Sequence, residues 1–383
     1  MAGMETIRTD VVGSLLRPQA LLDARAALES GAIDAETFKG VEDRAVAAAV
    51  RMQEDLGLDV VTDGEFRRLN FQDSFGACVL GFDASPSKLE AYDARVAGAS
   101  PLRRWDIPDL EKKGTAIAHR LPVVHRLRLG RNLPLEEFTY ASSVASKPVK
   151  VSLIGPDRIS QRFAHESSKD VYESVEAFMA DVVALQRQMI QALIEAGCRY
   201  VHIDAPGLTA YVDEASMAKM RERGEDPARN LERSLRAEAA ITAGFEQAVF
   251  GIHLCRGNQR SMWHREGAYD AIAERMFHEL PHRRFLLEYD SPRAGGFAPL
   301  RFVPKGKIVV LGLVSTKTAE LESVDALVRR IEEAAKFLPL EQLAISPQCG
   351  FASDVVGNLI SADDQKRKLE RVVETARKVW GSS

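Results

Sequence analysis

Two patterns of apolar residues alternate along this chain: long segments with helical spacing and short continuous runs. Between residues 35 and 56, apolar side chains recur at steps of three and four, which is typical of a helix with one buried face, and Gly57 follows as a stop signal. The same spacing over residues 171–196 predicts a second long helix. Short apolar runs such as residues 58–62 separate these segments and predict buried strands. Further helices are predicted over residues 18–28, 214–223, 228–245, 267–280, 323–337 and 362–380.

Eight segments have the character of strands, and helical sequence separates most of them. They lie near residues 11, 60, 151, 202, 251, 286, 310 and 345. Regular alternation of strand and helix predicts a parallel sheet, and eight such units predict an α/β fold of the (β/α)8 TIM-barrel type. A doubly wound sheet is the alternative, but no glycine-rich dinucleotide fingerprint follows the first strand.

Residues 70–145 interrupt this rhythm and predict an insertion after the second strand. The stretch is loop-like, with glycine and proline, and it contains an alternating run at 123–129 that predicts a hairpin lying over the main body. Arg126 and Arg128 of that run are expected on its solvated face, or else in contact with an anionic substrate. The whole chain, residues 1–383, is predicted to form a single barrel domain that contains this insertion.

Composition narrows the class of protein. The chain has 383 residues, of which 45% are hydrophobic, and a formal net charge of −4. This mild acidity gives no electrostatic reason to expect nucleic acid or an anionic membrane as a partner. The chain starts without an apolar signal-like run, and its longest apolar run, residues 308–314, is far shorter than the roughly 20 residues that span a bilayer. We therefore expect a soluble, cytoplasmic protein.

The predicted carboxyl ends of the strands carry polar residues that can bind metals or substrates. Active sites of barrels lie at these ends. The residues there are Ser14, Glu65, Asp204, His253 with Cys255, Glu288 and Cys349. His253 and Cys255 share one face of a strand, about 6–7 Å apart, and an imidazole with a thiolate is half of a typical zinc site. The alternative is that this histidine and these cysteines only pack in the core.

The other two cysteines carry no such indication. Cys198 precedes its strand, so we expect it at the opposite end of the barrel in a structural role, and Cys78 lies in the insertion without an assigned role. Four cysteines are too few for a disulfide scaffold, and a reducing compartment is expected.

Several segments together resemble the catalytic barrel of the cobalamin-independent methionine synthases, in order and through nearly the whole chain. They are Val12-Gly13-Ser14, Asp63-Gly64-Glu65-Phe66, Lys147-Pro148-Val149-Lys150 with Gly155-Pro156, Ile203-Asp204, His253-x-Cys255, Glu288 and Pro347-x-Cys349-Gly350. The resemblance implies Zn²⁺ as cofactor, with four ligands: His253, Cys255, Glu288 and Cys349. It also implies that Glu65 and Asp204 hold the ammonium group of an amino-acid thiol, with Ser14 near its carboxylate.

The sequence departs from the family pattern in ways that bear on the methyl donor. The classical enzymes are about twice as long and carry a duplicate barrel. Ala205 stands where the family has a glutamate, and Val314 stands where the family has a histidine implicated in protonating the departing folate. A leaving amine needs a positioned acid, for which Lys317, His202 and His264 are the alternatives. These departures weaken a folate donor more than they weaken zinc–thiolate chemistry.

The resemblance therefore predicts a zinc-dependent methyltransferase that moves a methyl group to a small-molecule thiol such as homocysteine, from a folate, a methyl-corrinoid or another donor. Two alternatives are an epoxyalkane:coenzyme M transferase-like enzyme and a non-catalytic zinc- or thiol-binding paralogue. Glu65 and Asp204 favour an amino-acid thiol, whereas Arg256, Arg260 and the hairpin arginines suit a sulfonate. The remaining charged residues of this region are expected on the solvated surface, namely Arg265, Glu266, Arg283 and Arg284.

Overall fold

A six-stranded parallel sheet forms most of a barrel in the computed structural model, which describes residues 6–83 and 121–381. The strands pair in chain order and are β3 (Lys150–Ile154), β4 (Tyr200–Asp204), β5 (Val249–Leu254), β6 (Arg284–Glu288), β7 (Ile308–Val314) and β8 (Leu343–Pro347). Almost every residue in them is buried, because both faces of a parallel barrel sheet are covered. The predicted α/β barrel is thus confirmed.

The two predicted strands near residues 11 and 60 need correction, because each makes a single parallel bridge in place of a ladder. The bridges pair Thr9 with Ile345 and Val61 with Val149. Side chains replace the missing ladder bonds. The Asp59 carboxylate accepts from the backbone N–H groups of Arg8 and Thr9 at 2.7 and 2.9 Å, and the Thr9 hydroxyl accepts from the Asp59 N–H at 2.8 Å. Contacts between side chain and backbone therefore complete the barrel here.

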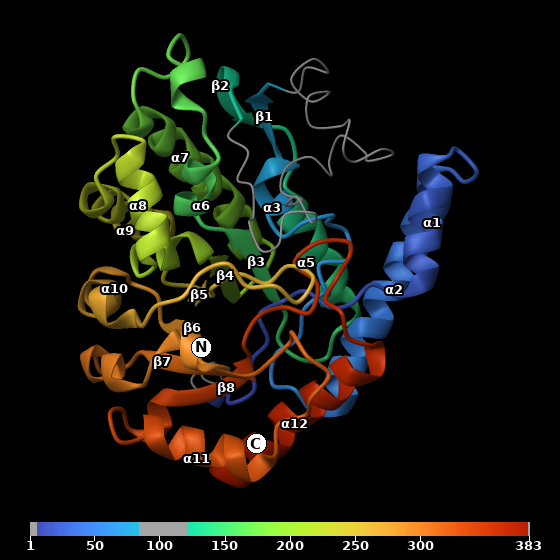
Figure 1. Cartoon of the computed structure of the whole chain (residues 1–383). Helices are drawn as coiled ribbons and strands as arrows, with labels where there is room; N and C mark the ends of the chain where they lie inside the picture. The colour runs from blue at the N-terminus through green and yellow to red at the C-terminus, as the bar shows by residue number, and fades with distance from the viewer. Residues whose placement is uncertain (1–5, 84–120, 382–383) are drawn as a thin grey trace.

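Helices surround the strands (Figure 1). They are α1 (Gln19–Glu29), α2 (Ala35–Leu56), α3 (Asp73–Gly76), α5 (Leu133–Val144), α6 (Pro156–Gln161), α7 (Val175–Glu195), α8 (Glu214–Glu222), α9 (Pro227–Thr242), α10 (Ala273–Glu279), α11 (Val324–Ala334) and α12 (Ala362–Trp380). Local signals explain their ends: Asp34 caps α2 through the Thr37 N–H, and Gly57 ends it with φ 89°. No helix in the described ranges is long and apolar enough to cross a membrane.

The alternating run at residues 123–129 forms strand β2 (Val123–Leu129), which pairs antiparallel with β1 (Val79–Phe82). The predicted loop-like stretch also contains α5, a helix that the sequence interpretation missed. Asn132 caps α5 through the Leu135 N–H, but the helix has only a weak apolar periodicity. Residues 84–120 lie outside the described ranges, so the full extent of the predicted insertion and the single-domain organisation stay predictions.

A cluster of charges fills the amino-terminal end of the barrel. Asp10 accepts from Lys150 Nζ at 2.7 Å, from the Tyr200 hydroxyl at 2.8 Å and from Arg284 Nε at 3.1 Å. Arg284 is 1% exposed, which contradicts the expectation that it lies on the solvated surface. The carboxylate that faces it compensates the cost of burying its charge.

Candidate metal centre and adjoining pocket

Three of the predicted zinc ligands lie together at the carboxyl end of the barrel. His253 lies in β5, and Cys255 is the first residue after that strand. Cys349 comes two residues after the end of β8. One ligand atom from each lies within 4.8 Å of the others, and all three side chains are buried. The residues are distant in sequence but converge because parallel strands present their carboxyl ends at the same rim.

The electrostatics of this cluster favour a bound cation. A hydrogen bond from Cys349 lowers the pKa of Cys255 to about 6, and the same interaction raises the pKa of Cys349. Burial alone would lower the pKa of His253, but Cys255 and then Asp204 raise it. Two adjacent thiols cannot both ionise without a counter-charge, and two sulfurs with one imidazole are the soft donor set that zinc prefers. The residues present therefore fit a zinc ion.

Asp204, at the end of β4, orients the histidine. His253 Nδ1 lies 3.0 Å from Asp204 Oδ1, and His202 Nε2 lies 3.1 Å from the same oxygen. A carboxylate on one ring nitrogen fixes the ring and leaves the other nitrogen for a metal. His202 is fully buried, and burial, followed by the charge of Lys150, lowers its pKa to about 4. His202 is therefore neutral near pH 7 and is a poor source of protons.

Glu288, the fourth predicted ligand, is the last residue of β6 and is fully buried. Its carboxylate is not a member of the three-residue cluster. Instead, Oε2 accepts from the Arg256 backbone N–H at 2.5 Å, and Oε1 lies 3.4 Å from Arg293 Nη2. Its charge still acts on Cys255 and Cys349. The side chain thus lies beside the cluster with both oxygens engaged, and its role as a ligand stays a prediction.

A cavity of about 130 Å³ adjoins the cluster and contains the three predicted substrate residues. These substrate residues are Ser14, Glu65 and Asp204. The clustered ligands His253, Cys255 and Cys349 line the same cavity. Sequence positions from the first strand to the last therefore meet at one cavity. This is the arrangement expected for a site at the mouth of a barrel.

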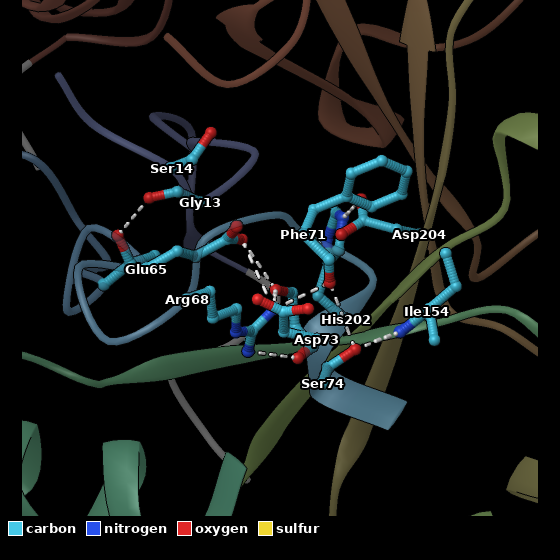
Figure 2. Close-up of polar contacts among 12 residues, drawn as sticks. Gly13, Ser14, Glu65, Arg68, Phe71, Asp73, Ser74, Ile154, His202 and Asp204 are labelled. Carbon is cyan, nitrogen blue, oxygen red and sulfur yellow. Dashed lines mark hydrogen bonds and ion pairs between the residues drawn. The ribbon is translucent and has the colours of Figure 1, made fainter. Parts of the chain in front are cut away.

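Glu65 is held in an unusual backbone conformation. Its φ is 57°, a left-handed value that is uncommon for a residue with a side chain. Glu65 Oε1 accepts from Ser152 Oγ at 2.7 Å. The same oxygen lies 3.8 Å from Arg68 Nη1 (Figure 2). A Cβ atom on Gly13 would lie only 2.6 Å from the same oxygen. Burial raises the pKa of Glu65 although the Arg68 charge opposes this.

The segment that carries Glu65 is fixed to the barrel by buried polar contacts. Arg68 forms a salt bridge with Glu137 of α5 at 2.6 Å and donates to the Ser152 carbonyl at 2.7 Å. Ser74 Oγ accepts from the Ile154 N–H at 2.9 Å (Figure 2). Glu65 therefore depends on the long connection after the second predicted strand for its orientation.

Ser14 lies in the segment between the first bridge, at Thr9, and α1. Its hydroxyl accepts from the Ala352 N–H at 3.3 Å, and a Cβ atom on Gly350 would lie 2.0 Å from that oxygen. The glycine next to Cys349 thus allows the Ser14 segment to approach the metal cluster closely. Figure 2 shows Gly13 and Ser14 near Glu65.

Sequence reasoning missed several cavity residues, above all Arg158 and Arg265. Arg265 was expected on the surface, and this is corrected: it lines the cavity and donates to the Pro206 carbonyl at 2.5 Å. Both arginines follow carboxyl ends of strands, Arg158 after β3 and Arg265 in the connection after β5. Their position after the carboxyl ends of strands is the sequence feature that could have identified them as residues of the site.

Two of the cations that the sequence offered for a sulfonate, Arg256 and Arg126, are engaged elsewhere. The Arg256 guanidinium donates to the Gly267 carbonyl at 3.0 Å from Nε and stacks over the Tyr269 ring. On the hairpin, Arg126 pairs with Asp181 at 2.8 Å.

Val314, which stands where the family has a histidine, is fully buried at the end of β7.

Comparison with known proteins places the chain in a family. The family model described as "Cobalamin-independent synthase, Catalytic domain" matches residues 7–102 and 294–377. The chain is 35% identical to the uncharacterized protein YxjG of Bacillus subtilis, covering 97% of this chain and 94% of YxjG, and 33% identical to YxjH of the same organism with the same coverage. It is 28% identical to a methionine synthase of Pyrococcus abyssi, over 90% of this chain and 86% of that protein.

A solved structure shows the same relationship. The chain superimposes on a putative vitamin-B12-independent methionine synthase from Listeria monocytogenes with a TM-score of 0.71, 26% identity and 97% coverage of both chains. A B12-independent methionine synthase from Shewanella, solved with selenomethionine, has a TM-score of 0.72 at 16% identity and supports the fold alone. The chain therefore belongs to the cobalamin-independent methionine synthase family.

Proposed function

We propose that this protein is a zinc-dependent methyltransferase that moves a methyl group to the sulfur of a small thiol such as homocysteine. The observation that carries the proposal is the convergence of His253, Cys255 and Cys349 within 4.8 Å beside a cavity. When bound, zinc would lower the pKa of a substrate thiol and keep it as a nucleophilic thiolate. The family membership independently supports methyl transfer.

The residues of the chain would divide the remaining tasks. Asp204 orients His253 through its Nδ1. Glu65, which points into the cavity and is buried, would accept hydrogen bonds from the ammonium group of an amino-acid thiol. Ser14, next to Gly350, would contact the carboxylate side of the same substrate. Glu288 would serve as a fourth ligand that exchanges with the thiol.

The leaving group sets a further requirement. A departing amine must receive a proton, but Val314 is apolar and His202 is held neutral by burial. Lys317 ends in a buried Nζ that has no hydrogen-bond partner among the described residues, and His264 lines the cavity. These two remain the candidates for an acid. A corrinoid donor would need none.

The test is the formation of a thioether by the zinc-loaded full chain. Homocysteine and coenzyme M are each incubated with methyltetrahydrofolate, methylcobalamin or epoxypropane, and the products are identified by mass spectrometry. S-methylation of homocysteine with either methyl donor is expected. If coenzyme M with epoxypropane is the only pair that yields a thioether, the epoxyalkane transferase alternative is favoured. The absence of any thioether would favour a non-catalytic binding protein.

A further inference from the structure

Arg265 occupies the junction between the metal-site cavity and a second, larger cavity of about 720 Å³. Both cavities are lined by Arg158, His264 and Arg265. The second cavity lies between α6, α8 and α9 and adds Lys219, Arg223 and Arg233 to its lining, against Glu166 and Glu225. Lysine and arginine thus outnumber carboxylates along the lining of the second cavity.

The Arg265 guanidinium is only partly used by the protein. Its Nη1 donates to the Pro206 carbonyl at 2.5 Å and lies 3.3 Å from Thr209 Oγ1. These two contacts fix the plane of the group against the start of η4 (Pro206–Tyr211). Nε and Nη2 have no hydrogen-bond partner within residues 6–83 and 121–381, and they are not among the buried unsatisfied atoms. They are donors held in place at the cavity wall.

The hydrogen bonds that Arg265 makes within residues 6–83 and 121–381 go to Pro206 and Thr209, and neither partner is a carboxylate. The two aspartates whose charges act on Arg265 are engaged with other groups. Asp157 accepts from the hydroxyls of Tyr211 and Ser234, and burial raises its pKa. Asp213 caps α8 through the Ser216 N–H at 2.8 Å. Burial, and then the charge of Arg158, lower the pKa of Arg265. Arg265 therefore lies at the cavity wall close enough to the Arg158 guanidinium for the charge of one to act on the other.

We infer that Arg265, together with Arg158, forms a subsite for an anionic group of the substrate, a carboxylate, sulfonate or phosphate remote from the reacting atom. A planar guanidinium with free donors in a fixed orientation is suited to bind such a group through two hydrogen bonds. The subsite rests on the proposed function, because it selects which thiol or donor reaches the metal cluster. The anion belongs either to the thiol or to the alkyl donor.

The experiment measures binding without turnover, on the zinc-loaded full chain, by isothermal titration calorimetry. One pair of probes tests the thiol as the source of the anion: 3-mercaptopropionate and the uncharged 3-mercapto-1-propanol. A second pair tests the donor: tetrahydrofolate and its uncharged dimethyl ester. The variants are Arg265→Gln and Arg265→Lys. The matched control is Arg236→Gln on α9, whose side chain is 68% exposed and lines neither cavity.

The wild type should bind the charged member of one pair about 10- to 100-fold more tightly than the uncharged member, the range expected for charge-assisted hydrogen bonds. Arg265→Gln should abolish this preference, Arg265→Lys should restore part of it, and the control should retain it. Zinc content and the unfolding midpoint confirm that each variant is folded.

A preference that Arg265→Gln leaves unchanged, or equal or undetectable binding of both members of both pairs to the wild type, would overturn the inference. Because no methyl transfer is needed, the result stands apart from the thioether assay. If the protein binds the anion but forms no thioether, the inferred subsite is supported and the proposed methyl transfer is refuted.

Discussion

His253 Nδ1 and Asp204 Oδ1 lie 3.0 Å apart at the carboxyl ends of two adjacent strands. From this contact we predict a role for Asp204 in metal binding, which its sequence position alone did not indicate. Replacing Asp204 with alanine should weaken zinc binding by about 10- to 100-fold, the usual effect of losing the carboxylate behind a histidine ligand. Competition with a chromophoric chelator measures the affinity.

The exposed Asp170→Asn variant is the control for the Asp204 substitution. The same measurement separates the two roles of Asp204. If the residue served only to hold a substrate ammonium, its loss would raise the KM for homocysteine and leave the zinc affinity unchanged. A change in both would show that one carboxylate acts on metal ligand and substrate together.

Cys349→Ser should remove both zinc and activity, because a serine hydroxyl is a poor substitute for a thiolate at neutral pH. Metal content by mass spectrometry should fall from about one zinc per chain to a small fraction. Cys198→Ala is the matched control, since Cys198 is also buried and its thiol donates to the Tyr200 carbonyl at the other end of a strand. A fully active Cys349→Ser enzyme that retains no zinc would refute the metal hypothesis.

Glu65→Gln should raise the KM for homocysteine by about 10- to 100-fold, because a carboxylate that accepts from an ammonium group is replaced by a neutral amide. A thiol without an ammonium group, such as 3-mercaptopropionate, should be affected little. Gly13→Ala should act in the same direction, since its new Cβ would displace the Glu65 carboxylate. The surface variant Glu136→Gln provides the baseline, and an equal loss for both thiols would exclude an ammonium contact.

Asp10→Asn should destabilise the barrel by about 3–5 kcal/mol at pH 7, because Lys150 and Arg284 would lose their buried counter-charge. Urea unfolding measures this free energy. Asp325→Asn breaks an exposed pair with Lys378 and should cost less than about 1 kcal/mol. A similar small loss for Asp10→Asn would show that the cluster contributes little.

Acid should weaken the same cluster. Burial alone would raise the pKa of Asp10, but Lys150 and Arg284 lower it from 3.8 to about 2. The folded state therefore holds the proton less tightly than the unfolded state. The stabilisation from this group is complete above pH 3.8 and is lost as the pH falls towards 2.

His282 should make the protein less stable between pH 6.5 and about pH 3. Neither ring nitrogen has a hydrogen-bond partner in the described chain, and burial, followed by the charge of Lys307, lowers its pKa from 6.5 to about 3. Only the unfolded chain takes up this proton below pH 6.5, so stability falls as the pH falls, by at most about 1.4 kcal/mol per pH unit. His282→Leu should remove that slope in unfolding curves, whereas His278→Gln on the exposed face of α10 should keep it.

The periodicity of the sequence determined the main elements and their order. Helix α2 and its glycine stop agree with the predicted boundaries, because an amphipathic helix with a strong cap depends mainly on local sequence. The parallel strands from β3 to β8 were likewise visible as apolar runs between helices. The segments near residues 11 and 60 have the same composition but form single bridges, because pairing depends on neighbours distant in the chain.

The sequence also supplied the residue types of the candidate site, since position at a strand end places a side chain at the barrel mouth. Only the tertiary structure decided how they are used. It joined Cys349 to His253 and Cys255, turned both oxygens of Glu288 towards Arg256 and Arg293, and brought Arg265 from an expected surface position into a cavity wall. Strand periodicity fixes the face and the end on which a side chain lies, whereas hydrogen-bond partners and burial depend on barrel closure and on long connections that no local pattern specifies.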